Sequence, residues 1–141
     1  MSATLLYRIA AVILVLFAAG HTLGFMRFRP ASPEGLAVFE AMNSVQFEFK
    51  GAKYSYANFY KGFGLMVTAY LLFSACLAWI LGNLSVSQSQ AIGMLAWAFA
   101  AVQGVCLVLS VLYFFLVPAV FSGAVVVCLV WAAWLVVRAG Q

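Results

Sequence analysis

The chain has 141 residues, of which 67% are hydrophobic and 7% are charged, and its formal net charge is +4. Soluble domains carry about a quarter charged residues, so the composition excludes a domain for which water is the main solvent. The excess of Lys and Arg forms no basic face interleaved with polar groups, which argues against nucleic-acid binding and favours contact with anionic lipid headgroups.

Four apolar segments are long enough to cross a membrane, whose hydrocarbon core needs about 20 helical residues. The expected spans are residues 5–26, 59–81, 91–116 and 118–137. The first segment also resembles a signal peptide, because an apolar run after a basic residue leads to the small residues Ala18 and Gly20. The run continues through "HTLGFM" to spanning length, which favours a retained helix.

Residues 27–58 form the segment between spans that is large enough to fold outside the membrane. Ser32, followed by Pro33 and Glu34, is a helix-start signal and predicts a short helix. The next stretch, "QFEFKGAKYSY", alternates aromatic residues around Gly51, which predicts a β-hairpin with its aromatic side chains on one face. Such a face is typical of an aromatic belt at the membrane interface; the alternative is a lid over a pocket.

The last two spans are separated only by "VPA", and Pro118 suits the first turn of a helix. They are therefore expected to form a tight antiparallel hairpin, with both termini and the loop at residues 82–90 on one side of the membrane. Four tryptophans lie toward that side and are expected to anchor it: Trp79, Trp97, Trp131 and Trp134. Five basic side chains lie with the large loop: Arg27, Arg29, Lys50, Lys53 and Lys61. The positive-inside rule then makes the large loop cytoplasmic.

These elements predict an all-α fold. It is a polytopic membrane protein, a four-transmembrane-helix bundle with an extramembrane helix-plus-β-hairpin insert between helices 1 and 2. Residues 1–141 are expected to form a single transmembrane domain. The expected location is the bacterial inner (cytoplasmic) membrane.

Polar residues inside the spans are the functional candidates, because each costs free energy unless it finds a partner. Counting inward from the large-loop side at about 1.5 Å per residue places His21, Ser110 and Ser122 at one level. Tyr60, Lys61 and Tyr113 then lie just above, at the mouth of the bundle. We expect a polar cavity on this side, with these candidate ligand-binding residues: His21, Tyr60, Lys61, Gly64, Ser110, Tyr113 and Ser122.

His21 is the only histidine, and three roles are open to it. It could form an interhelical hydrogen bond to Ser110, Ser122, Tyr60 or a backbone carbonyl. It could line a pocket or act as a general acid or base, since imidazole can exchange a proton near neutral pH. It could bind a metal or haem iron, but no second strong ligand lies at its level, so no metal and no cofactor are expected.

Other intramembrane residues also have two interpretations. Lys61 either extends to the headgroups or binds an anionic ligand group. Gly20 and Gly24 are expected to allow close helix packing, and Gly62 and Gly64 either do the same or let a ligand approach the backbone. Gln103 is expected to form an interhelical hydrogen bond. Cys106 and Cys128, equally far from the last turn, are either packing residues or a redox pair.

The stretches "RIAAVILVLFAAGHTLGF", "FYKGFGL" and "LVWAAWLVV" together resemble a family of small, uncharacterised bacterial four-helix membrane proteins. In that family a "GHT" step lies late in helix one and an aromatic-"GFG" step opens helix two. The resemblance covers nearly the whole chain and implies no known activity. The layout is more distantly similar to DoxX-like proteins, some of which are linked to quinone or thiosulfate chemistry. The cysteine and charge patterns of an oxidoreductase are missing here.

The first functional hypothesis is binding of a lipid-like or quinone-like small molecule around His21. The alternative is an accessory or structural subunit that binds another membrane protein, or a second copy of the chain, through its apolar helix faces. No nucleophile has an adjacent base, which favours a non-enzymatic function. A transporter is a third option, although no intramembrane carboxylate is present to couple protons. The expected partners are membrane lipid and a hydrophobic small molecule, with no nucleic acid.

Overall fold

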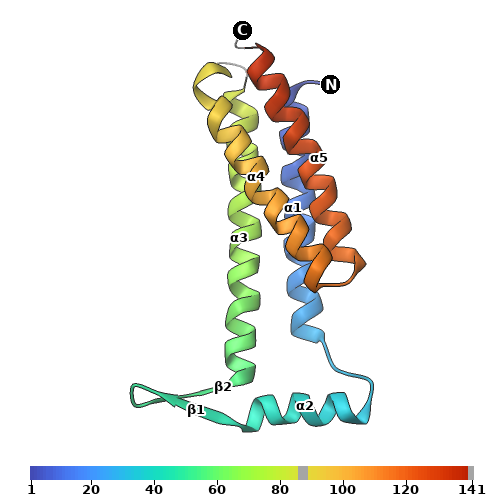
Figure 1. Ribbon diagram of the computed structural model, residues 1–141, viewed down its shortest axis with the longest axis vertical. Coiled ribbons are helices and arrows are strands. Elements are labelled where there is room, and N and C mark those ends of the chain that lie inside the picture. The colour runs from blue at the N-terminus through green and yellow to red at the C-terminus, as the bar shows by residue number, and fades with distance from the viewer. Residues whose placement is uncertain (86–88, 140–141) are drawn as a thin grey trace. The chain divides into compact units, whose positions relative to one another are not determined.

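The computed structural model describes residues 1–85 and 89–139 (Figure 1). In chain order its elements are α1 (Ala3–Arg27), α2 (Pro33–Ser44), β1 (Gln46–Phe49), β2 (Ala52–Ser55), α3 (Tyr56–Leu84), α4 (Ser89–Tyr113) and α5 (Leu116–Ala139). The helices α1, α3, α4 and α5 are each long and apolar enough to cross a membrane. The predicted all-α fold with four spanning helices and a helix-plus-hairpin insert is confirmed, and the chain is a multi-pass membrane protein.

The turn between the last two helices differs from the prediction. Helix α4 ends at Tyr113 and α5 begins at Leu116, so the connection is "FF" and not "VPA". The first N–H groups of a helix have no intrahelical acceptor, so a proline costs no hydrogen bond there. Helix α5 can therefore begin two residues before Pro118, which lies within its first turn.

The predicted loop at residues 82–90 is shorter in the structure. Residues 82–84 belong to α3, and Ser89 begins α4. The part of the predicted loop at residues 86–88 lies outside the described residues.

The chain forms two compact units. The bundle unit comprises Met1–Phe17 and Leu71–Gln141, and the insert unit comprises Ala18–Tyr70.

In the bundle unit, α1 meets α3 at a glycine and α3 meets α4 through a hydrogen bond. A Cβ added to Gly82 would lie 3.2 Å from the Cβ of Tyr7, which shows how close the two helices are. The Gln103 side-chain amide of α4 donates to the Ser74 hydroxyl of α3 at 3.1 Å, and both side chains are buried. The predicted interhelical hydrogen bond of Gln103 is confirmed.

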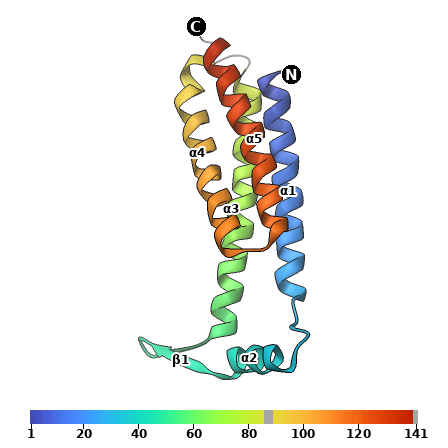
Figure 2. The same cartoon turned by 45° about the vertical axis from the view of Figure 1, so that its right-hand side comes forward.

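The remaining contacts of the bundle unit involve α5. Helices α4 and α5 lie side by side (Figure 1 and Figure 2), and the hydroxyl oxygens of Ser110 and Ser122 are 3.3 Å apart across their contact. Phe17 of α1 stacks on Phe121 of α5 with ring centroids 5.2 Å apart. The bundle unit is thus a closed ring of helices in the order α1, α3, α4, α5.

In the insert unit, α2 begins as predicted. The Ser32 hydroxyl accepts a hydrogen bond from the Gly35 N–H at 3.1 Å, Pro33 is the first helical residue, and Glu34 lies in the first turn. Helix α2 runs across the direction of the first turns of α3 in both views (Figure 1 and Figure 2).

The hairpin that follows has a two-residue turn at Lys50 and Gly51. Both residues have a positive φ, 51° and 81°, as a type I′ turn requires. The register pairs Phe47 with Tyr54, so both aromatic rings lie on one face as predicted. Phe47 also contacts Phe59 in the first turn of α3 with centroids 6.0 Å apart, which packs the hairpin on that helix.

Changing the hairpin turn should alter backbone exchange across β1 and β2. Asn accepts a positive φ readily, whereas a branched side chain in that region costs roughly 1–2 kcal/mol. Lys50→Asn should therefore slow amide hydrogen exchange in both strands, and Gly51→Val should accelerate it by about tenfold or more. Exchange measured by mass spectrometry in detergent tests this, with the α4 amides as an internal control. Unchanged strand exchange in Gly51→Val would contradict the two-residue turn.

Candidate functional site

His21 of α1 is tied to the backbone of α3 within the insert unit. Its Nε2 lies 3.1 Å from the Gly64 carbonyl oxygen. A carbonyl can only accept, so Nε2 carries a proton, and in the neutral form of the ring Nδ1 has a lone pair. Among the partners predicted for His21, a backbone carbonyl is the one present.

Gly64 is needed where these two helices meet. A Cβ at this position would lie 2.8 Å from Cε2 of Phe25, a distance that real Cβ atoms do not tolerate. The ring centroids of Phe25 and His21 are 5.1 Å apart, and the two rings are tilted by 42°. The missing side chain of Gly64 therefore lets Phe25 pack against α3 beside the histidine.

Two threonines form a second polar link between the same helices. The Thr22 and Thr68 hydroxyl oxygens are 2.8 Å apart, and Thr22 also donates to the Ala18 carbonyl at 2.8 Å. Thr68 lies 3.1 Å from the Gly64 carbonyl. Thr68 donates to that carbonyl, whose two lone pairs allow it to accept from both Thr68 and His21.

These threonines were absent from the sequence-based site. Thr22 follows His21 directly, and Thr68 lies one helical turn after Gly64, on the same face. A search for intramembrane hydroxyl groups on the faces of His21 and Gly64 would have found both.

The Nδ1 atom of His21 is the polar atom of this cluster that remains open. Within residues 1–85 and 89–139, no hydrogen-bond partner of Nδ1 is found. In the same part of the chain, the Tyr7 hydroxyl is the side-chain polar atom that is fully buried without a partner. The Nδ1 atom is thus unpartnered but not fully buried. Nδ1 is therefore accessible from outside the protein, and the half-buried imidazole presents one acceptor.

The other predicted residues of the insert unit lie near Gly64. Tyr60 and Lys61 precede it by four and three residues, so they share its face of α3. Both are exposed, Tyr60 by 49%.

The predicted residues of the bundle unit are placed differently. Ser110 and Ser122 are 8% and 4% exposed and are hydrogen-bonded to each other. Tyr113, at the end of α4, is 75% exposed. The common level of His21 with these serines joins residues of both units and stays a prediction.

The glycines around the site fall into two kinds. A Cβ added to Gly20, Gly24 or Gly62 would have nothing within 4 Å, whereas one added to Gly64 would collide with Phe25. The α1 backbone on both sides of His21 is therefore uncovered at these glycines. The close helix packing predicted for Gly20 and Gly24 is not seen in the described part of the chain.

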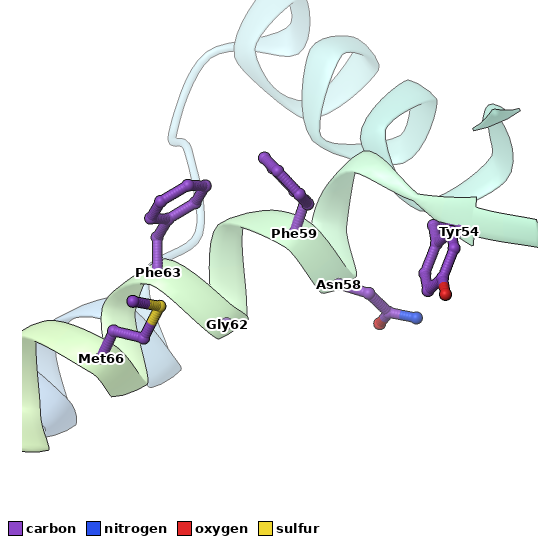
Figure 3. Close-up of a pocket in the computed structure, with 6 residues that line it drawn as sticks. All are labelled: Tyr54, Asn58, Phe59, Gly62, Phe63 and Met66. Atoms are coloured by element: carbon purple, nitrogen blue, oxygen red, sulfur yellow. The ribbon is translucent and has the colours of Figure 1, made fainter. Parts of the chain in front are cut away.

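A shallow groove of about 200 Å³ lies on the insert unit (Figure 3). Its lining is Tyr54, Asn58, Phe59, Gly62, Phe63 and Met66. Phe59 and Phe63 project from the same side of α3, one turn apart (Figure 3). None of the seven predicted ligand residues lines this groove, and its volume is below the 300–1,000 Å³ typical of ligand pockets.

The cysteines and acidic residues form no further centre in the described part of the chain. In the described part of the chain Cys76, Cys106 and Cys128 form no disulfide, and a redox role for Cys106 and Cys128 stays a prediction. Among residues 1–85 and 89–139, no three His, Cys, Asp or Glu side chains meet in a group that could hold a metal ion.

No protein-family model matches the chain, and no curated protein or solved structure is significantly similar to it.

Substituting two glycines of α3 should have opposite effects on stability. Gly64→Ala adds a Cβ that collides with Phe25, and should lower the thermal midpoint in detergent. Gly62→Ala adds the same atom in open space, and should raise stability by up to about 1 kcal/mol because Ala is the better helix former. Phe25→Leu should rescue Gly64→Ala. Equal midpoints for Gly62→Ala and Gly64→Ala would contradict the proposed contact.

Proposed function

We propose that the chain binds a lipid-like small molecule that donates a hydrogen bond to His21. The single observation behind this proposal is the accessible Nδ1 of a ring whose Nε2 is already held by the Gly64 carbonyl. A polar atom without a partner in hydrocarbon costs free energy. A ligand hydroxyl would remove that cost.

The fixed proton of His21 narrows the class of ligand. A neutral ring bonded through Nε2 offers only an acceptor to a ligand. A quinol, an isoprenoid alcohol or a protonated fatty acid has the matching donor. A quinone carbonyl has not, so within the quinone-like class the reduced form fits better.

Two features near His21 support access of such a molecule. Gly20 and Gly24 leave the α1 backbone uncovered, so a flat or branched apolar body can approach it closely. Lys61, on the Gly64 face of α3, has three N–H donors that would bind a second oxygen of the ligand near the membrane surface. Ser110, Tyr113 and Ser122 belong to the proposed pocket only if they lie at the membrane depth predicted for them, at or just above that of His21.

The uncovered glycines also support an alternative function. Small residues four apart let two membrane helices approach closely, so Gly20 and Gly24 could receive a helix of another membrane protein or of a second copy. In that case the chain is an accessory subunit, and His21→Ala would leave the association intact. In either case we propose a bacterial cytoplasmic membrane as its location, in line with its resemblance to small bacterial four-helix membrane proteins.

The proposal is tested with two probes that differ by one donor, farnesol and farnesyl methyl ether. Purified protein in detergent should bind farnesol about tenfold more tightly than the ether. One net hydrogen bond contributes about 1.4 kcal/mol, which corresponds to a tenfold difference in affinity. His21→Phe should remove this difference. Binding is measured by native mass spectrometry and by the shift in thermal midpoint.

Thr4→Val is the matched control. Thr4 is hydrogen-bonded at 3.1 Å to Ser85, the residue that follows α3 in the bundle unit, so it also ties α1 to the end of α3 but lies outside the proposed site. This variant should keep the preference for farnesol. Equal binding of alcohol and ether by the unmodified chain, or a preference that survives His21→Phe, would overturn the proposal.

A further inference from the structure

The bundle unit has a groove of its own, between α1 and α3. It has a volume of about 340 Å³ and an almost entirely apolar lining. Ala11 and Ala75 are both 5% exposed and form its floor. Val12, Val15 and Leu16 line the α1 side, and Cys76 and Trp79 line the α3 side.

The positively charged Arg8 side chain lies at one end of this groove. The Arg8 guanidinium carbon lies 5.3 Å from the centre of the Trp79 ring, which lines the groove. Arg8 precedes Val12 by four residues and Val15 by seven, so it lies on the groove face of α1. From Arg8 to Leu16 the helix rises about 12 Å.

Arg8 has no acidic side chain near it in sequence, and its unit contains none. The three carboxylate side chains of the chain are Glu34, Glu40 and Glu48, and all belong to the insert unit. In the described part of the chain, the interaction found for Arg8 is the one with Trp79. A guanidinium has five donors in a planar fork that matches a phosphate, and stacking on an aromatic ring leaves these donors free.

We propose that this groove is a binding site for one anionic phospholipid. An acyl chain lies along the floor between α1 and α3, and the phosphate is bound by Arg8 beside Trp79. The apolar lining matches the chain, and the unpaired cation at its end matches the headgroup. Tryptophan is enriched in membrane proteins at the membrane–water interface, where lipid headgroups lie. The site is separate from the one proposed at His21, so either can fail without the other.

Trp79 is a built-in reporter for the acyl chain. In a Trp97→Phe/Trp131→Phe/Trp134→Phe background it is the only tryptophan. The protein is reconstituted in phosphatidylcholine vesicles in which a minor fraction of the lipid has brominated acyl chains, either as phosphatidylglycerol or as phosphatidylcholine. Quenching should show that phosphatidylglycerol is enriched about fivefold over phosphatidylcholine at Trp79. This factor is the preference for anionic lipid that one basic side chain gives.

Two variants and a competition test assign this preference. Arg8→Gln should reduce the enrichment to the level of phosphatidylcholine. Arg138→Gln removes the same charge in the same background and should not reduce the enrichment, because Arg138 does not adjoin the groove lining. Val15→Phe fills the groove without changing the charge and should also remove the enrichment. Unbrominated phosphatidylglycerol, added to the folded parent, should restore the fluorescence, and the same amount of phosphatidylcholine should not.

Three results would overturn the proposal. Equal quenching by both brominated lipids in the parent would exclude a specific site. Enrichment that survives Arg8→Gln would exclude the guanidinium as its cause. Loss of enrichment in Arg138→Gln to the same extent as in Arg8→Gln would show a general effect of net charge.

Discussion

The absence of water in a hydrocarbon core is the constraint on which this structure depends. Every backbone polar group in a span must be bonded within the chain, which is why the apolar segments are helices. The same constraint acts on the polar side chains of the spans, which pair where two helices meet: Ser74 with Gln103, Ser110 with Ser122, Thr22 with Thr68, and His21 with the Gly64 carbonyl. The Tyr7 hydroxyl, buried without a partner in the described part of the chain, is the exception. An unsatisfied buried group costs about 1–3 kcal/mol, which is comparable to what burying the aromatic ring contributes.

The charged groups divide the chain in two, and the two proposals follow this division. All three glutamates and five of the seven basic residues belong to the insert unit. The bundle unit has Arg8 and Arg138, and each guanidinium stacks on a tryptophan. A unit without acidic side chains leaves its cations available to lipid phosphate. The insert unit, by contrast, offers an acceptor at His21, which is suited to a neutral donor.

Local patterns were enough to predict most of the fold. The number and order of the spans, the Ser32 cap and the turn at Gly51 depend on residues close in sequence, and these were correct. The end of α4 was wrong because a proline fits any of the first few positions of a helix, so Pro118 marks the start of α5 only to within a turn. Of the site, the sequence identified His21 and Gly64 but not their bond, and it missed Thr22 and Thr68. Which residues meet depends on the rotation of each helix about its axis, and residue depth along a span carries no information on rotation.

Helix rotation also explains why glycines with similar sequence surroundings differ in role. Gly62 and Gly64 are two residues apart and therefore lie on different faces of α3, so Phe25 covers Gly64 while Gly62 stays open. An open glycine in a helix costs about 1 kcal/mol relative to alanine and gains no packing in return. At Gly62 no contact in the described part of the chain offsets this cost, and the feature to which Gly62 contributes is the groove that it lines. Gly20 and Gly24 differ from Gly62 because they flank a histidine whose Nδ1 is also without a partner. The proposed ligand would cover the backbone at these glycines and donate to the unpaired acceptor, both within one turn of α1.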